Sequence, residues 1–242
     1  MITVVFWLWK DPLCHREYTI EHVERAVAMV DRNLTLPHRF VLITDQPVTI
    51  PNVRTVPLWN DFHLLKAPMA RWRREYVQCY VRLRSFSDED YIHDILGERF
   101  VSMDLDMIVA GSLDPLFDRP EDFLIVRATD HPHRGPYNGS MWLMTTGARR
   151  QVWEDFSLEA IKGMPENIDF HITDQGWIYY RLGPDEAGWS TADGVYLWPK
   201  IVERYNVHPR QLPADCRVAF FNGGEKPWDL RWAKRLWESA SV

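Results

Sequence analysis

The stretch that decides the fold reads Arg99-Phe-Val-Ser-Met-Asp-Leu-Asp-Met-Ile-Val-Ala-Gly-Ser-Leu-Asp-Pro-Leu-Phe117. Its first five residues predict a buried strand that leads directly to Asp104. Asp104 and Asp106 are one residue apart at the end of that strand, so both carboxylates are expected on one side, where they can share a hard cation. Adjacent carboxylates repel each other and are costly to desolvate, which favours a metal or a basic partner over a merely solvated strand end.

Strands and helices alternate around this stretch. Residues 2–9 form a near-continuous apolar run, typical of a strand buried on both faces of a parallel sheet. Thr19 can cap a following helix. Further strands are predicted at 39–44, 53–56, 123–128, 140–145 and 217–221, and helices at 65–83, 149–161 and 173–181. This order predicts one α/β domain over residues 1–242, with its ligand beyond the carboxyl ends of the strands.

Composition excludes several classes of protein. The hydrophobic fraction of 46% and the charged fraction of 26% are those of a soluble globular chain, and the first apolar run is too short for a transmembrane segment. A net charge of −6 without a Lys/Arg block argues against a nucleic-acid partner. Cys14, Cys79 and Cys216 are odd in number and lack Cys-x-x-Cys spacing, which predicts a reducing compartment, the cytoplasm.

The segment around Asp104-Leu105-Asp106 closely resembles the metal-binding core of glycosyltransferase family 8 and its bacterial relatives. In that family a strand ends in Asp-x-Asp, an apolar run follows, and a Leu-x-Pro-Leu turn closes the segment. Weaker similarities follow in the family's order: Tyr80-Val81-Arg82-Leu83, Asn138-Gly139-Ser140, Asp174-Gln175 and Gly223-Gly224-Glu225-Lys226-Pro227-Trp228. The resemblance implies a GT-A fold, with a mixed, mostly parallel central sheet flanked by helices.

The resemblance also implies an activity, namely transfer of a hexose from a nucleotide diphosphate sugar, usually a UDP-sugar, to an unidentified acceptor. Mn²⁺ or Mg²⁺ and retention of anomeric configuration are part of that implication. Asp104 and Asp106 would be metal ligands, with Leu105 beside them in the donor site, and Lys226 would approach the phosphates through the turn at Gly223. The sugar pocket would contain four polar residues: Asp130, Asn138, Asp174 and Gln175.

The sequence departs from the family at the third metal ligand. Family 8 proteins have a metal-binding His just before Gly-x-x-Lys-Pro-Trp, and here the nearby residues are Phe220, Phe221 and Asn222. The amide oxygen of Asn222 can substitute as a weaker, neutral ligand. This departure keeps an alternative open, in which the chain is a non-catalytic GT-A protein that binds a nucleotide sugar.

Other residues have two interpretations each. Arg82 is either a second cation near the phosphates or the partner of a structural carboxylate. Trp7 and Trp9 either stack on the base or belong to the core, and Asp45 either contacts base or ribose or ends a turn.

A phosphatase of the haloacid-dehalogenase type also uses an Asp-x-Asp pair, but that pair lies on the first strand, where this chain has Trp7 and Trp9. The motifs of P-loop nucleotidases, serine hydrolases and zinc proteases do not occur.

Overall fold

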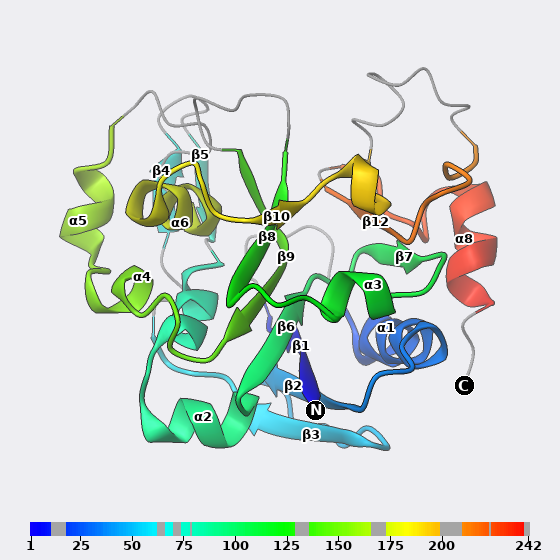
Figure 1. Cartoon of the computed structure of the whole chain (residues 1–242), viewed down its shortest axis with the longest axis horizontal. Coiled ribbons are helices and arrows are strands. Elements are labelled where there is room, and N and C mark those ends of the chain that lie inside the picture. Colours follow the sequence, from blue (N-terminus) through cyan, green and yellow to red (C-terminus); the bar gives the residue numbers. More distant parts are fainter. Residues whose placement is uncertain are drawn as a thin grey trace.

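A seven-stranded sheet forms the centre of the molecule, in the order β10-β8-β9-β6-β1-β2-β3 (Figure 1). The computed structural model describes residues 1–10, 18–61, 66–69, 74–77, 79–128, 136–165, 173–198, 210–222 and 224–239, with only the main chain at 66–69 and 74–77. The strands are β1 (Ile2–Leu8), β2 (His38–Thr44), β3 (Val53–Pro57), β6 (Arg99–Met103), β8 (Phe123–Arg127), β9 (Tyr137–Thr145) and β10 (Gly188–Trp189).

The sheet is mixed, as predicted. β6, β1, β2 and β3 are parallel neighbours, so their carboxyl ends lie along one edge. β9 runs antiparallel to both β6 and β8, and β10 is parallel to β8. The expected α/β class with a mostly parallel central sheet is therefore confirmed.

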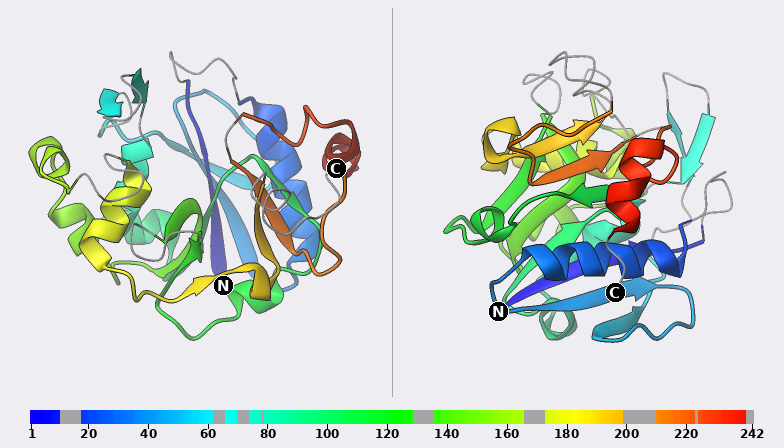
Figure 2. Two further views of the ribbon diagram at one scale, coloured as in Figure 1. Left: turned by 90° about the horizontal axis from the view of Figure 1, so that it is seen from above. Right: turned by 90° about the vertical axis from the view of Figure 1, so that its right-hand side faces the viewer.

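Helices cover both faces of this sheet (Figure 2, left). One face carries α1 (Ile20–Asn33) and α8 (Arg231–Glu238), and the other carries η1 (Cys79–Phe86), α2 (Asp90–Leu96), α4 (Gln151–Glu154), α5 (Leu158–Lys162) and α6 (Asp174–Leu182). Both faces of β1 are buried: Val4 and Phe6 pack in the core on the α1 side of the sheet, whereas Val5 and Trp7 pack in the core on the other side. Burial on both faces removes the usual polar alternation of a strand.

α1 begins where the sequence predicts. Thr19 is its N-cap, and the Thr19 amide donates to Nδ1 of His22 at 2.9 Å. Such a reciprocal contact satisfies an amide that has no partner within the helix. Val23, Ala26 and Met29 then follow at helical spacing and are completely buried against the sheet.

The helix predicted at 65–83 is wrong. The described residues of that range form a two-stranded antiparallel hairpin of β4 (Lys66–Met69) and β5 (Arg74–Val77), followed by η1, a 3₁₀ helix. Pro68 disfavours a helix that includes residues 65–68, because proline lacks an amide hydrogen and its ring clashes with the preceding turn of a helix. The helix predicted at 149–161 is also corrected, since α4 and α5 are separate short helices and Ser157 caps the second.

Sequence analysis missed a second, three-stranded sheet of order β11-β12-β7. β7 (Met107–Val109) pairs antiparallel with β12 (Val218–Phe221), and β11 (Val195–Trp198) pairs parallel with β12. α8 lies beside this sheet (Figure 1) and buries Ala233 against Ile108 and Phe221. The remaining short helices are α3 (Asp114–Phe117) and η2 (Thr191–Asp193). This small sheet brings the end of β12 next to the residues that follow β6.

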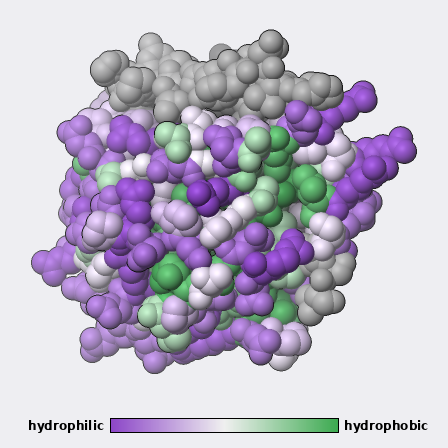
Figure 3. All heavy atoms as spheres, turned by 45° about the vertical axis from the view of Figure 1, so that its right-hand side comes forward, coloured by the Kyte–Doolittle hydropathy of each residue, from purple (hydrophilic) through white to green (hydrophobic). Residues whose placement is uncertain are grey.

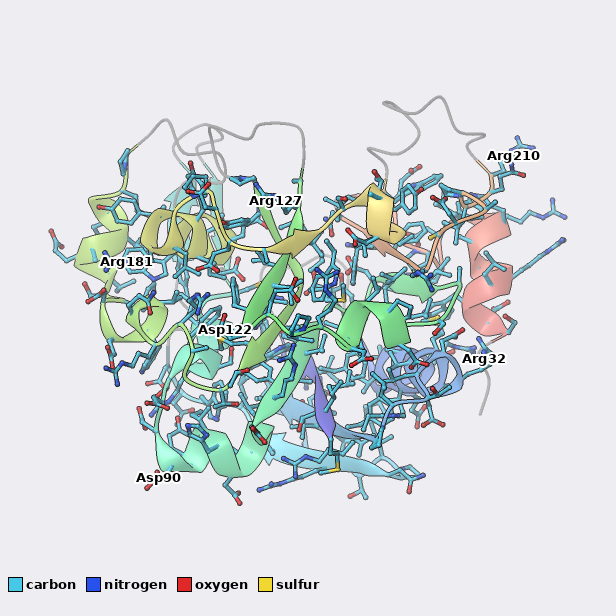
Figure 4. The ribbon with its side chains drawn as sticks, in the orientation of Figure 1. Arg32, Asp90, Asp122, Arg127, Arg181 and Arg210 are labelled. Atoms are coloured by element: carbon cyan, nitrogen blue, oxygen red, sulfur yellow. The ribbon has the colours of Figure 1, made fainter. Side chains whose placement is uncertain are left out.

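The surface is mainly hydrophilic on the face that Figure 3 shows. Charged side chains project outward around the periphery, and Arg32 lies where α1 meets the segment after α8 (Figure 4), donating to the carbonyl of Ser239 at 3.1 Å. Among the helices that the structure describes, none has the length and apolar character needed to cross a bilayer.

Candidate functional site

A cavity of about 460 Å³ opens at the carboxyl ends of β1 and β6. It is lined by the last residues of these two strands and those that follow them, the start of α1, Gln46 after β2, and Cys79 and Arg82 of η1. Asp104, Leu105 and Asp106 all line it. This is the edge at which ligands of open α/β sheets bind, as the sequence predicts.

Asp104 is held by Arg82 on one side of the cavity. Nη1 of Arg82 donates to Oδ1 of Asp104 at 2.6 Å, and Nη2 donates to Oδ2 of Asp174 at 2.5 Å. Nη1 also donates to the carbonyl of Gly139 at 3.2 Å. The side chain of Arg82 is only 6% exposed, so this planar cation joins two carboxylates away from water. Arg82 is thus the partner of two carboxylates, and because it also lines the cavity, a role near the phosphates stays a prediction.

Asp174 and Gln175 begin α6, and their side chains contact Arg82 and Gly139, respectively. Oδ1 of Asp174 accepts the amide of Gln175 at 2.9 Å, and the hydroxyl of Thr173 accepts the amide of Gly176 at 3.1 Å. Oε1 of Gln175 accepts the amide of Gly139 at 3.0 Å. The first turn of α6 is thereby joined to β9.

β9 reaches the site through an irregularity in its pairing. Opposite β8, its register jumps from Trp142 to Asn138, so the intervening residues bulge. Within the bulge, the carbonyl of Ser140 accepts the amide of Asp104 at 2.8 Å. Gly139 fits here because a Cβ on it would lie 3.1 Å from Nη2 of Arg82.

Asp106 has a different cation. Nζ of Lys226 donates to Oδ2 of Asp106 and, at 3.0 Å, to the carbonyl of Phe221. The hydroxyl of Tyr18 donates to the same Oδ2 at 3.1 Å. The side chains of Lys226 and Asp106 are 10% and 7% exposed, so this ion pair is also largely buried.

Aromatic packing positions the lysine. Trp228, two residues after Lys226, packs edge-on against Tyr18 and His22, with ring centroids 5.7 and 4.2 Å apart, and against Trp237 of α8. Burial lowers the pKa of His22, which favours its neutral form in this cluster. The turn after β12 is therefore anchored on α1.

Asn222 lies beside this site rather than in the core. Its Oδ1 accepts the hydroxyl of Ser140 at 2.9 Å, and Ser140 is the residue whose carbonyl holds Asp104. Phe220 is completely buried in the apolar core. Ser140 therefore connects the side-chain oxygen of Asn222 to the main chain of Asp104.

The buried charges do not balance. We call Asp104, Asp106, Asp174, Arg82 and Lys226 the carboxylate cluster; its three carboxylates against two cations leave one excess negative charge. Burial raises the pKa of Asp104 to about 6, against the opposing effect of Arg82 and with a further increase from Asp106. The side chain of Asp104 is 28% exposed to the cavity. The cluster is therefore suited to receive a cation.

The donor atoms fit a hard divalent cation, which prefers oxygen ligands. Within the ranges that the structure describes, no group of three or more His, Cys, Asp or Glu side chains could hold a metal. Among the described residues, a metal here would have the carboxylates of Asp104 and Asp106, and the further ligands available are neutral oxygens such as that of Asn222.

The other predicted residues lie as follows. Trp7 is nearly buried and donates its indole N–H to Ser102 at 2.9 Å, whereas Trp9 is partly buried, and both line the cavity. Oδ2 of Asp45 accepts the amide of Lys10 at 3.2 Å in an exposed turn. Asn138 is buried and its Oδ1 accepts the amide of Ser140 at 3.0 Å. Asp130 and Gly223 lie outside the described residues.

Two site residues escaped sequence analysis, Tyr18 and Ser140. Tyr18 precedes the capping residue of α1 by one position and carries no motif of its own. Ser140 lies in the Asn138-Gly139-Ser140 motif and begins a predicted strand, but no sequence pattern indicates that it joins Asp104 to Asn222. The available signal for Tyr18 was its position just before a helix that begins at the carboxyl edge of the sheet.

Comparison with known proteins shows the fold. No protein-family profile matches the sequence, and no curated protein matches it at a significant level. Among solved structures, the galactosyltransferase LgtC in complex with donor and acceptor sugar analogs is 12% identical with a TM-score of 0.59, over 98% of this chain and 95% of that one. GlyE, a glycosyltransferase of Streptococcus pneumoniae, is 13% identical with a TM-score of 0.64, over 100% of this chain and 61% of that one. Mouse xyloside xylosyltransferase 1 is 11% identical with a TM-score of 0.53, over 90% and 96%. This chain has the GT-A fold that such glycosyltransferases share.

Proposed function

We propose that this protein is a glycosyltransferase that moves a hexose from a nucleoside diphosphate sugar, with uridine as the base, to an acceptor. The observation that carries the proposal is the carboxylate cluster at the cavity, which Asp104 and Asp106 line, with Asp104 paired to Arg82, Asp106 paired to Lys226 and one negative charge in excess. A diphosphate cannot enter such a site without an accompanying cation, because like charges repel strongly where water is excluded.

Asp104, Asp106 and the amide oxygen of Asn222 are the residues that would hold Mn²⁺ or Mg²⁺. When bound, the divalent cation neutralises negative charge on the departing diphosphate. Lys226 contributes a second, mobile charge to the same phosphates.

The chain's other polar groups orient the sugar. Arg82, which lines the cavity, holds the Asp174 carboxylate behind it, and the Gly139 amide donates to the carbonyl of the Gln175 side chain. The amide nitrogen of Gln175 is thereby directed for donation to a hydroxyl or ring oxygen. Asp130 and Asn138 complete the proposed sugar pocket. Retention of anomeric configuration is part of this proposal, and its support is the resemblance to family 8.

A second candidate is a non-catalytic protein that binds nucleotide sugars. Phe220, buried in the core near the position where family 8 proteins have a metal-binding His, favours it. The two candidates differ in turnover. We expect metal-dependent release of UDP from a UDP-hexose, which a pure binder would not show even though it binds the donor.

Thermal unfolding tests the donor site directly. UDP at about 100 times its dissociation constant should stabilise the protein by about 2.7 kcal/mol in the presence of Mn²⁺. Without the metal the increase in melting temperature should largely vanish. Asp106→Asn should keep the fold and weaken metal-dependent UDP binding by about tenfold, because a carboxylate ligand of a hard cation is lost. Equal stabilisation in EDTA, or an unchanged affinity of Asp106→Asn in calorimetry, would refute the metal bridge.

A further inference from the structure

The two aspartates of the site are paired in different ways. Arg82 is fixed, because its guanidinium donates to Asp104, to Asp174 and to the carbonyl of Gly139. Lys226 instead contacts one carboxylate, Asp106, with an ammonium at the end of a flexible stem, and the carbonyl of Phe221 is its other acceptor. Three rotatable donors on an unbranched side chain can be redirected without moving the main chain.

Lys226 and Tyr18 together occupy one oxygen of Asp106. Both the ammonium and the phenol hydroxyl donate to Oδ2, and the ammonium lies 5.8 Å from the centre of the Tyr18 ring. A divalent cation that binds this oxygen needs the same lone pairs. It would also be repelled by the ammonium at close range, since both are positive in a site that is largely shielded from water.

We propose that Lys226 is a resident counter-ion of Asp106, which gives way when a divalent cation binds and then turns to the diphosphate. This inference rests on the proposed function of the site. The resting protein holds Asp106 neutralised by Lys226, so metal alone binds weakly. A nucleoside diphosphate offers the displaced ammonium new acceptors, so metal and nucleotide bind together.

The net charge of the carboxylate cluster changes in the same order as the proposed binding steps. A divalent cation reverses the sign of the excess charge, and the phosphates then meet a site with both the metal and Lys226 available. Binding free energies are reciprocal, so the factor by which UDP tightens Mn²⁺ binding equals the factor by which Mn²⁺ tightens UDP binding. Lys226 should account for much of that factor.

The test is the affinity for Mn²⁺ alone, measured from the electron paramagnetic resonance signal of free Mn²⁺ and by calorimetry. We compare the wild type with Lys226→Met and with Lys234→Met, a matched change at an exposed lysine of α8. Lys226→Met should bind Mn²⁺ without nucleotide about fivefold more tightly than the wild type, because the competing cation is gone. In the wild type UDP should tighten Mn²⁺ binding by about tenfold, and this factor should shrink in Lys226→Met. Lys234→Met should behave as the wild type.

Tyr18→Phe is the second variant, which keeps the ion pair and removes only the phenol hydroxyl. It should tighten Mn²⁺ binding in the absence of nucleotide by about twofold, because one of the two hydrogen-bond donors that compete with the metal for Oδ2 of Asp106 is removed. Suppose that UDP tightens Mn²⁺ binding in the wild type, but Lys226→Met binds Mn²⁺ alone no more tightly than the wild type does. This result would overturn the counter-ion role and leave the proposed function standing. If the wild type binds neither Mn²⁺ nor UDP in any combination, both the proposed function and this inference are wrong.

Discussion

Arg82 is the residue whose loss should damage the fold of the site most. Its guanidinium is the cation that joins Asp104 of the β6 end to Asp174 of the α6 start. Arg82→Met keeps much of the apolar stem and removes the charge. The two carboxylates would then remain near each other without their shared partner, and the Gly139 carbonyl would lose a donor.

The magnitude follows from burial. Removing one member of a buried ion pair costs about 3–5 kcal/mol, because the remaining charge stays desolvated. Asp174 is buried, with 9% of its side chain exposed, whereas Asp104 opens to the cavity and can be partly hydrated. We therefore expect the lower end, a loss of about 3 kcal/mol in the free energy of unfolding. For a chain of this length that is a fall of roughly 6–12 °C in melting temperature.

Urea unfolding monitored by tryptophan fluorescence and circular dichroism measures this loss. Arg150→Met is the control, because Arg150 forms an exposed i,i+4 pair with Glu154 and should change the free energy of unfolding by less than about 0.5 kcal/mol. Arg82→Lys should fall between the wild type and Arg82→Met, since one ammonium cannot serve both carboxylates. A loss for Arg82→Met no larger than that of Arg150→Met would refute the claim that this ion pair holds the site together.

Three further predictions concern the surroundings of the site. Gly139→Ala should cost about 1–3 kcal/mol in urea unfolding and weaken UDP binding, because its Cβ would press on Arg82; an unaltered unfolding curve would contradict the tight fit. His22→Gln should lessen the loss of stability between about pH 7.5 and 5.5. Burial lowers the pKa of His22, so the folded state resists its protonation and loses stability as the pH falls through the pKa of His22 in the unfolded state. Gln can keep the capping contact and does not titrate. Equal pH dependence of stability in both proteins would exclude this role of His22. Asn222→His should tighten Mn²⁺ binding in the presence of UDP more than Mg²⁺ binding, because imidazole is a softer ligand than an amide oxygen; calorimetry that shows no change for either metal would place Asn222 outside the coordination sphere.

Local sequence patterns were sufficient for the elements next to the site. The apolar run of β1, the cap at Thr19 and the strand that ends at Asp104 are all where the sequence predicts them. Each depends on residues a few positions apart, whose spacing reports the period of a strand or the first turn of a helix. The helix predicted at 65–83 is wrong, and local sequence explains only its start, where Pro68 disfavours a helix; the hairpin of β4 and β5 depends on pairing between two segments.

The partners of the two aspartates were decided by the tertiary structure. Arg82 is 22 residues from Asp104 and 92 from Asp174, and Lys226 is 120 residues from Asp106. The residue spacing within one segment cannot indicate pairs so far apart in the sequence. These pairs follow from the order of the strands, the bulge in β9 and the small sheet that places β12 next to the end of β6. The sequence by itself determined that two carboxylates stand at the end of a buried strand. Only the tertiary structure decided that Asp104 pairs with Arg82 and Asp106 with Lys226, because those pairs depend on which side chains the fold brings together from distant segments.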